Sequence, residues 1–350
     1  MVPRAQKLGY IRALDLGPGI MKTRFDITLN SLHFAAAHGH ERDLFKMSVA
    51  NIEMEVSEFC NRACSFCPNA LFDRRGLKGT MSDALYGRIM ADLASIDYAG
   101  RICFHRYNEP LADREYILGR IKECAQRLPR AHTKIYTNGD YLTADYLDDL
   151  HAAGLRELLA TVYLGDTQKY DPALMAQRFR ARLEALGLPY EMMVEEPDYR
   201  LARVTHKGGL HVYYRGKNFE NPIGEAGQIQ SWDRGGSVES LSTYQRRSPC
   251  LVVFNEMHIE MDGTVVPCCN IRTDNPEHRA YKVGQIGPDG SIFDVWCGAA
   301  MAAWRRRLLR FGPKDAPCRS CSFAVVKETP ALVAQFEDAA RQLGLFDQAI

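Results

Sequence analysis

The sequence predicts an α/β fold, a partial (β/α)6 TIM-like barrel followed by a small α+β domain rich in cysteine. Strand-like and helix-like segments alternate from residue 51 to about residue 215, and such alternation is typical of a parallel sheet covered by helices. The composition then changes, because residues 216–249 are rich in Gly, Ser, Asn and Pro, as loops and linkers are. Six of the 11 cysteines follow in residues 250–321, which indicates a second module for metal or redox chemistry.

These changes divide the chain into predicted segments. They are an N-terminal extension (1–50), the partial barrel (51–215), a linker (216–249), the cysteine-rich domain (250–325) and a C-terminal helix (326–350). A chain of 350 residues is long enough for one large domain with a small domain beside it.

The composition excludes several classes of function. With 46% hydrophobic and 25% charged residues, the chain resembles ordinary globular proteins. A formal net charge of +1 makes neither nucleic acid nor an anionic membrane an expected partner. No apolar run is long enough to span a bilayer, and the first residues lack the apolar core of a secretory signal. We therefore expect a cytoplasmic protein whose cysteines serve metal or redox chemistry rather than disulfides.

The predicted strands of the barrel are short apolar runs. They lie at 51–57, 101–106, 133–137, 157–163, 189–194 and 210–214. Amphipathic helices are predicted between them, at 81–96, 114–128, 143–154 and 172–187. The connection at 196–209 is short and poorly periodic, and is predicted as a plain connection. Functional residues of such a barrel should follow the carboxyl ends of its strands.

The N-terminal extension gives weaker signals. Residues 32–47 have helix-like spacing and include His33, His38 and His40. We expect these histidines to be surface or helix-capping residues rather than metal ligands. The extension is also too short for a separate peptide-recognition domain.

Three cysteines follow the first predicted strand at C-x3-C-x2-C spacing: Cys60, Cys64 and Cys67. Thiolates are soft ligands that suit zinc or an iron–sulfur cluster. Structural zinc sites and electron-transfer clusters take four protein ligands. Three thiolates on a four-iron cluster instead leave one iron open to a substrate or cosubstrate. The alternative is a zinc site whose fourth ligand is distant in the sequence.

Two further strand ends carry polar residues. Asn108 and Glu109 precede a proline after the second strand, and Thr137 and Asn138 precede a glycine after the third. Asn, Gly and Pro are also common turn formers, so each motif alone has an ordinary explanation. Together with the cysteine loop, they mark three successive strand ends as one predicted site.

The cysteine loop resembles the signature of the radical S-adenosylmethionine (radical SAM) superfamily, C-x3-C-x-aromatic-C, because Phe66 precedes the third cysteine. The resemblance implies that the three cysteines hold a four-iron, four-sulfur (4Fe-4S) cluster whose open iron binds the methionine end of S-adenosylmethionine. It also implies that Phe66 lies against the adenine, that Asn108 and Glu109 lie at the methionine ammonium, and that Thr137 and Asn138 lie at the ribose. The family motif reads Gly-Glu-Pro, so Asn108 departs from it. Glu109 keeps the carboxylate that pairs with an ammonium.

The C-terminal cysteines have a pattern of their own. Twelve residues separate Cys250 from Gly263, four more precede Cys268, and the pair Cys318 and Cys321 follows. This pattern resembles the auxiliary-cluster modules called SPASM and twitch. The resemblance implies one auxiliary 4Fe-4S cluster, and thus two 4Fe-4S clusters per chain, with Cys250, Cys268, Cys318 and Cys321 as the auxiliary ligands. A structural zinc bound by four thiolates is the alternative.

Local patterns predict the elements around these cysteines. A hairpin should turn at Asp262 and Gly263, a helix should span 291–311, and the tail at 328–348 should form a docked helix. The other cysteines of strands and helices are expected to pack as small apolar residues. They are Cys103, Cys124 and Cys297.

The resemblance also implies a reaction. In the family, the reduced cluster cleaves S-adenosylmethionine to a 5′-deoxyadenosyl radical, which abstracts a hydrogen atom from a substrate in the barrel mouth. Members of this size with one auxiliary cluster act on aminocyclitols and aminoglycosides. We therefore expect a small polar substrate of the sugar, aminocyclitol or aminoglycoside kind, oxidised from alcohol to ketone with the auxiliary cluster as electron acceptor. A reducing partner such as flavodoxin or ferredoxin is implied as well.

Three alternatives stay open. Cys269 adjoins the auxiliary ligand Cys268 and points to the opposite side in an extended segment, so it either packs in the core or faces the active site. In the second case it would return a hydrogen atom to the substrate radical, which makes the protein an epimerase. A peptide-modifying maturase is the second alternative. The third is a non-catalytic iron–sulfur electron carrier or zinc-binding protein, which the residues Glu109, Thr137 and Asn138 at the strand ends disfavour.

Overall fold

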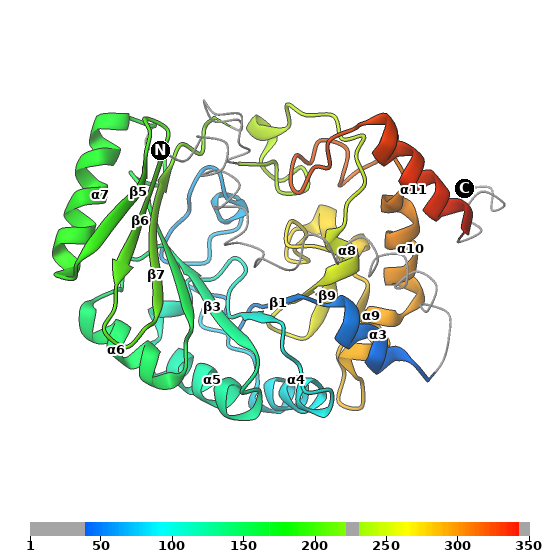
Figure 1. Cartoon of the computed structure of the whole chain (residues 1–350), viewed down its shortest axis with the longest axis horizontal. Coiled ribbons are helices and arrows are strands. Elements are labelled where there is room, and N and C mark those ends of the chain that lie inside the picture. The colour runs from blue at the N-terminus through cyan, green and yellow to red at the C-terminus, as the bar shows by residue number, and fades with distance from the viewer. Residues whose placement is uncertain (1–38, 168, 222–230, 343–350) are drawn as a thin grey trace.

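The fold is described from a computed structural model, over residues 39–167, 169–221 and 231–342 (Figure 1). One sheet of ten strands, ordered β10-β9-β8-β1-β2-β3-β4-β7-β6-β5, runs through the described residues. Six neighbouring strands at its centre run parallel. They are β8 (Glu256–Ile259), β1 (Asn51–Met54), β2 (Arg101–Cys103), β3 (His132–Thr137), β4 (Glu157–Val162) and β7 (His211–Lys217). The predicted α/β class with a parallel central sheet is confirmed.

Four helices follow β1 to β4 and cover the outer face of the sheet (Figure 1). They are α4 (Asp83–Ser95), α5 (Arg114–Arg127), α6 (Ala144–Ala153) and α7 (Pro172–Leu186). Each begins after a polar residue whose side chain accepts a backbone N–H of the first turn, as N-caps do. These residues are Ser82, Asp113, Thr143 and Asp171. All four helices lie where the sequence predicts them.

The two faces of the sheet differ in character. Ile52 and Met54 of β1 are buried in the main core between the sheet and the helices. Side chains alternate along a strand, so Glu53 points to the other, inner face. A separate apolar cluster around Leu159 and Leu201 covers the β4–β7–β6 side of that inner face.

The last strands of the barrel differ from the prediction. β5 (Tyr190–Glu195) and β7 lie where strands were expected, but β6 (Tyr199–Thr205) fills the supposed plain connection. β6 pairs antiparallel with both neighbours. The connections on either side of β6 are too short for a crossover helix, so the chain returns as hairpins. Arg200 and Arg203 weaken the apolar signal of β6, which explains why the sequence pattern misses this strand.

The cysteine-rich part extends the same sheet. β8 and β9 (Thr264–Val266) form the predicted hairpin, with Gly263 at φ +87° in its turn, and β10 (Gly284–Gln285) pairs with β9. The helix predicted at 291–311 is interrupted at Gly298, whose backbone is extended. The result is two helices, α9 (Ile292–Cys297) and α10 (Ala299–Leu309).

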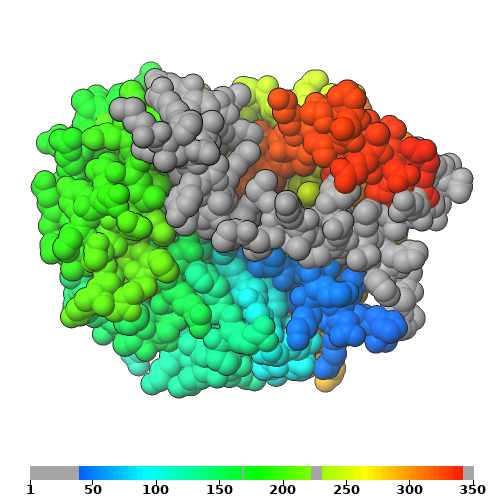
Figure 2. Space-filling view, in the orientation of Figure 1, coloured from blue at the N-terminus to red at the C-terminus, as the bar shows by residue number. Residues whose placement is uncertain are grey.

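Helices at both ends of the described chain pack on this part. In α3 (Glu41–Ser48), the ring centroid of Phe45 lies 5.2 Å from that of Phe293 and 5.5 Å from that of Trp296. His40 precedes α3 but makes no side-chain capping bond, and His33 and His38 lie outside the described residues. The predicted docking of the tail is seen in α11 (Pro330–Gln342), which buries Phe336 and Ala340. Figure 2 shows this orange-to-red end of the molecule opposite the green end formed by residues near α6 and α7.

Short elements complete the described chain. They are α8 (Val252–Asn255) and the 3-10 helices η1 (Pro68–Ala70), η2 (Pro110–Ala112), η3 (Glu239–Leu241) and η4 (Pro276–Tyr281). The other cysteines are buried as expected; they are Cys103, Cys124 and Cys297. Within the described residues, no helix has both the length and the apolar character needed to cross a bilayer.

The segment predicted as a linker is only partly exposed. β7 extends to Lys217, and Asp233, Arg246 and Ser248 are buried further on. β1 also pairs directly with β8, so one sheet joins the barrel to the cysteine-rich part. The division of the chain into separate domains therefore stays a prediction.

A glycine substitution tests the helix-to-strand connection after α6. Gly154 ends α6 with φ +101°, and a Cβ there would lie 2.5 Å from the Cβ of Ala125. Gly154→Ala should lower the free energy of unfolding by at least about 1–2 kcal/mol, because the left-handed backbone disfavours a side chain.

Gly119→Ala serves as the matched control. Gly119 lies exposed within α5, and nothing lies within 4 Å of the Cβ position. This substitution should raise the melting temperature, since alanine is about 0.5–1 kcal/mol more favourable than glycine in a helix. Equal melting temperatures for the two variants, measured by circular dichroism, would contradict the assigned backbone.

Candidate active site and cluster sites

The loop after β1 brings the first three cysteines together. Cys60 and Cys64 are buried and Cys67 is partly buried. Burial raises the pKa of both buried thiols, that of Cys60 to about 12, and the neighbouring thiols raise them further. Buried thiols that oppose one another's ionisation fit a multivalent metal centre that neutralises them together. The loop is anchored by Asp166 after β4, whose Oδ2 accepts a hydrogen bond from the backbone N of Ala63 at 3.0 Å.

Glu109 lies beyond the carboxyl end of β2 and is 2% exposed. Its Oε1 accepts hydrogen bonds from Thr137 Oγ1 at 2.6 Å and Leu111 N at 3.0 Å, and its Oε2 accepts one from Asn138 N at 2.8 Å. All three donors are neutral, and burial raises the pKa of Glu109 to about 7. Among the described residues, no Lys or Arg is a hydrogen-bond partner of this carboxylate, and none is among the main causes of its pKa shift. A buried carboxylate without a counter-ion fits a cationic ligand.

A second set of contacts ties the cysteine loop to the loop after β3. Asp140, after β3, accepts two hydrogen bonds from Arg62 at 2.7 and 2.8 Å and one from Asn61 at 2.8 Å. Arg182 of α7 donates to the same carboxylate at 2.6 Å. Asn138 in turn donates from Nδ2 to Asn61 Oδ1 at 2.7 Å. The cysteine loop and the loop after β3 are therefore tied by charged and neutral hydrogen bonds.

Asn108 has a local role in the structure. Its Oδ1 accepts a hydrogen bond from the backbone N of Arg106 at 2.9 Å, and its Nδ2 donates to Ser57 Oγ at 3.1 Å. The side chain thus tightens the turn before Glu109, which explains how Asn replaces the glycine of the family motif. Its contact with a ligand stays a prediction.

Phe66 belongs to an aromatic cluster. Its ring centroid lies 3.8 Å from that of Phe219, nearly parallel, and 5.5 Å from that of Tyr163. Lys217 Nζ lies 4.4 Å from the Phe219 ring centroid. Phe219 and Tyr163 follow β7 and β4, and no sequence motif singled them out. The contact of Phe66 with an adenine stays a prediction.

The four C-terminal cysteines line one cavity. Cys250, Cys268, Cys318 and Cys321 border it together with apolar residues. Burial raises the pKa of Cys318 to about 12 and that of Cys321 to about 11, and each is raised further by neighbouring thiols. Four convergent thiols around a small cavity fit a fully thiolate-ligated cluster or zinc.

Two donors point at this set of thiols. Arg246 Nη1 lies 3.9 Å and Asn270 Nδ2 lies 3.8 Å from Cys321 Sγ. Arg246 is buried and also donates to the backbone O of Phe323 at 2.6 Å. Hydrogen bonds to ligand sulfur and a nearby positive charge both favour a more reduced cluster.

Cys269 does not line that cavity and is absent from the main core cluster. Its thiol is partly buried, and burial raises its pKa well above the ordinary value. The charges of Glu53, Glu256 and Arg234 also act on it. The structure thus gives Cys269 charged neighbours, and whether it faces the substrate stays a prediction.

Arg234 is a site residue that the sequence did not reveal. It has φ +52°, and the two glycines that follow are also left-handed. Such backbone strain is often found at functional sites. Arg234 donates to Asn270 Oδ1 at 3.4 Å and is close enough to Cys67 and Cys269 for their charges to interact. The sequence offers one signal for Arg234, because it begins an Arg-Gly-Gly turn inside the segment predicted as a linker.

Known families match both cysteine regions of this chain. The Radical SAM superfamily matches residues 54–209, and the SPASM iron-sulfur cluster-binding domain matches residues 250–322. The chain is 41% identical over 274 residues to the S-adenosyl-L-methionine-dependent 2-deoxy-scyllo-inosamine dehydrogenase of Niallia circulans, covering 77% of this chain and 92% of that protein.

A solved structure agrees with these matches. The crystal structure of BtrN in complex with AdoMet and 2-DOIA aligns with a TM-score of 0.51 at 28% identity, covering 74% of this chain and 87% of that chain. The chain thus belongs to the radical SAM superfamily: it is a radical SAM oxidoreductase with a SPASM-type iron–sulfur domain, and its cofactors are S-adenosylmethionine and 4Fe-4S clusters.

Proposed function

We propose that the protein is an aminocyclitol dehydrogenase, which oxidises one secondary alcohol of a small, amine-bearing ring to a ketone. The observation that carries this proposal is the 41% identity with 2-deoxy-scyllo-inosamine dehydrogenase over 92% of that protein's length. The similarity to a structure that contains 2-DOIA supports a substrate of the same class.

The residues after the strands bind the cofactors. Cys60, Cys64 and Cys67 hold the first 4Fe-4S cluster, and Glu109 binds the methionine ammonium of S-adenosylmethionine. Thr137 and Asn138 keep the Glu109 carboxylate oriented through hydrogen bonds of 2.6 and 2.8 Å. Bound together, cluster and S-adenosylmethionine supply the one-electron chemistry that removes a hydrogen atom from an unactivated C–H bond.

The other residues proposed to contact S-adenosylmethionine lie near the same loops. Phe66 contacts the adenine, Asn108 shapes the turn beside the methionine, and Thr137 and Asn138 also border the ribose. The ring cluster formed by Phe66, Phe219 and Tyr163 gives that side of the site its apolar wall. Such a wall excludes water, which protects a reactive carbon centre from quenching.

The auxiliary cluster would supply the electron acceptor of the oxidation. Cys250, Cys268, Cys318 and Cys321 hold it, and the N–H groups of Arg246 and Asn270 near Cys321 favour its reduced state. Conversion of an alcohol to a ketone removes one hydrogen atom, one electron and one proton. The hydrogen atom leaves to the adenosyl carbon, the electron to the auxiliary cluster, and the proton to a base or solvent.

The first cluster would take up one electron per turnover and the auxiliary cluster would release one, so a one-electron carrier would serve both sites. A flavodoxin or ferredoxin is the partner of matching chemistry, since each delivers single electrons at low potential. A reducing compartment such as the cytoplasm would keep the seven proposed ligand cysteines out of disulfides.

An epimerase is the second candidate, and one observation favours it. The charges of Glu53 and Arg234 act on Cys269, and Cys269 is not among the residues of the main core cluster. A thiol there is positioned to return a hydrogen atom to a substrate radical, which inverts a carbon centre without net oxidation.

Iron analysis tests the two cluster sites. The reconstituted protein should contain about eight irons per chain, since each set of cysteines holds one four-iron cluster. Replacing Cys60, Cys64 and Cys67 together by Ala should leave about four irons and abolish S-adenosylmethionine cleavage. Stoichiometric zinc in anaerobically prepared, iron-replete protein would overturn the auxiliary assignment.

Glu109→Gln tests the ammonium site. The amide keeps the shape but loses the charge, so S-adenosylmethionine affinity should fall by about 1.5–3 kcal/mol, or roughly ten- to a hundredfold. Unchanged affinity, measured by equilibrium dialysis on the holoenzyme, removes Glu109 from the site.

The same site should be pH-dependent. The pKa of Glu109 is raised to about 7 in the free protein, and pairing with an ammonium requires the carboxylate. Affinity should therefore level off above pH 7 and fall toward tenfold per unit below it. The Glu109→Gln variant is the control, because its affinity should lose this dependence.

An anaerobic assay in deuterium oxide separates the two reactions. With 2-deoxy-scyllo-inosamine and dithionite, a dehydrogenase yields a ketone without solvent deuterium, and Cys269→Ala retains turnover. Deuterium at an inverted carbon, lost in Cys269→Ala, would establish the epimerase instead. Neither product with any aminocyclitol tested, despite S-adenosylmethionine cleavage, rejects the substrate class.

A further inference from the structure

The inner face of the sheet carries several buried carboxylates, and most have a cationic partner. Glu55 accepts from Arg74 at 2.6 Å, Glu157 pairs with Lys134 at 2.7 Å, and Glu260 lies 3.4 Å from Arg106. Each of these charges is compensated by a lysine or arginine of the protein itself. They are structural ion pairs that leave little capacity for a ligand.

Glu53 on β1 is different. Its Oε2 accepts a hydrogen bond from His258 Nδ1 at 3.2 Å, and its Oε1 accepts none from the described residues. Its side chain is 16% exposed, whereas the neighbouring Ile52 and Met54 are fully buried. Burial opposes its ionisation, but the hydrogen bond and charge of His258, with smaller contributions from His105 and Arg106, outweigh burial and hold the pKa of Glu53 at about 2. Glu53 is therefore an anion with one oxygen open to the inner face.

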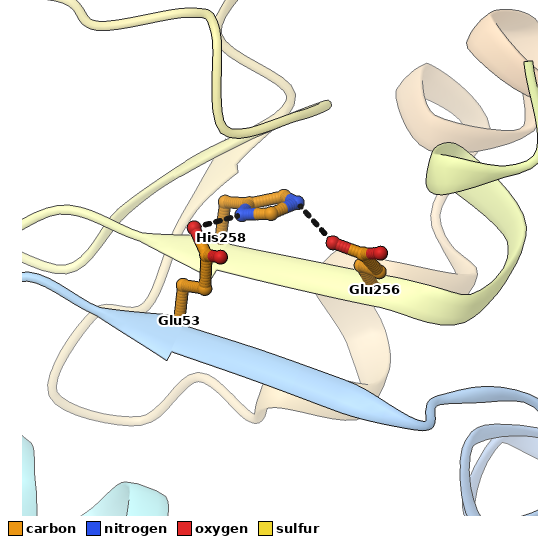
Figure 3. Close-up of side chains that lie close together, drawn as sticks. All are labelled: Glu53, Glu256 and His258. Carbon is orange, nitrogen blue, oxygen red and sulfur yellow. Dashed lines mark hydrogen bonds and ion pairs between the residues drawn. The ribbon is translucent and has the colours of Figure 1, made fainter. Parts of the chain in front are cut away.

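His258 joins Glu53 to a second carboxylate (Figure 3). The fully buried imidazole lies between Glu53 and Glu256, with its Nε2 3.5 Å from Glu256 Oε2. Nε2 makes no hydrogen bond there. An imidazole carries at most one positive charge, and it faces two carboxylates. His258 therefore occupies the Oε2 side of the Glu53 carboxylate and leaves Oε1 without a hydrogen bond from the described residues.

The groups beside Glu53 do not cancel this charge. Burial lowers the pKa of His105 to about 4, so this neighbour is neutral at pH 7. The Arg106 guanidinium pairs with Glu260 and donates to the backbone O of Ile271 at 2.5 Å. Glu53 also lies near Cys269, on whose pKa its charge acts. Glu53 is therefore close to the residue that adjoins the auxiliary ligand Cys268.

We propose that Glu53 is a specificity residue that binds the ammonium group of the substrate through Oε1. His258 acts as a positioning residue that fixes the Oε2 side of the carboxylate, and Glu256 contacts the other nitrogen of the same imidazole. This inference rests on the proposed function, since the proposed substrate is a hydroxylated ring whose only charge is that of its protonated amine. A carboxylate and an ammonium form a charge-assisted hydrogen bond, which a hydroxyl in the same place cannot match. The site would thereby select amine-bearing rings over all-hydroxyl rings.

The test compares two ring substrates in the reconstituted holoenzyme. One is 2-deoxy-scyllo-inosamine, and the other is the same ring with a hydroxyl in place of the amine. Glu53→Gln should raise KM for the amine roughly ten- to a hundredfold, leave kcat within a few-fold, and leave KM for the hydroxyl ring unchanged. Glu53→Asp keeps the charge and should recover part of the loss. Substrate-free release of 5′-deoxyadenosine should be equal in all variants.

Glu157→Gln is the matched control. Glu157 lies on the same face with similar exposure, 13%, but is already paired with Lys134. Its loss should change KM for both rings alike, leaving the preference for the amine intact. A Glu53→Gln variant that binds both rings as the wild type does, or loses both equally, overturns the proposal.

Direct binding separates this inference from the proposed reaction. If the wild type does not oxidise the amine, the dehydrogenase proposal fails, and calorimetric titration with the same two rings still decides the role of Glu53. Selective loss of amine binding in Glu53→Gln supports it, and equal binding by the two proteins refutes it. A stoichiometric manganese or zinc ion that is present in the wild type and absent from Glu53→Gln would also refute it, because Glu53, Glu256 and His258 would then form a metal site.

Discussion

The arrangement of the site depends on one buried carboxylate. Glu109 joins the ends of β2 and β3 through Thr137 and Asn138, and its own backbone N donates to Phe59 O at 2.7 Å, next to Cys60. An anion buried among neutral donors is costly unless a cation arrives. The unfavourable burial of the Glu109 carboxylate occurs where the methionine ammonium is proposed to bind. The loops after β1, β2 and β3 therefore meet at a carboxylate whose charge the proposed ammonium would balance.

A second constraint links the barrel to the cysteine-rich part. Arg74 bridges Glu55 beyond β1 and Asp274 beyond β9, at 2.6 and 2.9 Å. Tyr107 Oη donates to the backbone O of Cys269 at 2.8 Å, and Arg272 Nη1 donates to Asn69 Oδ1 at 2.8 Å. With the β1–β8 pairing, these bonds hold both cysteine sets on one rigid framework. Electron transfer between a substrate and an auxiliary cluster requires such a fixed separation.

The inner face of the sheet has an apolar part and a charged part. Its β4–β7–β6 side is apolar, around Leu159 and Leu201, and its β8–β1 side is charged, around Glu53 and His258. A polyhydroxylated ring with one amine has the same two characters, since its C–H faces are apolar and its amine is cationic. Recognition of such a ring can therefore be divided between the apolar part and the charged part of the same inner face.

The sequence by itself determined the architecture and the metal chemistry, because both depend on local patterns. Strand and helix periods placed β1 to β4 and their helices. The spacing of Cys60, Cys64 and Cys67, through its resemblance to the radical SAM signature, predicted an open cluster site without any long-range information. The tertiary structure alone decided which distant side chains meet. β6 is antiparallel because its connections to β5 and β7 are too short for a crossover helix. Arg234 becomes a candidate site residue because it lies in a left-handed turn and donates to Asn270. Glu53 and His258 are 205 residues apart, and only the pairing of β1 with β8 makes them neighbours. The charge balance at such a contact depends on packing, which no local pattern records.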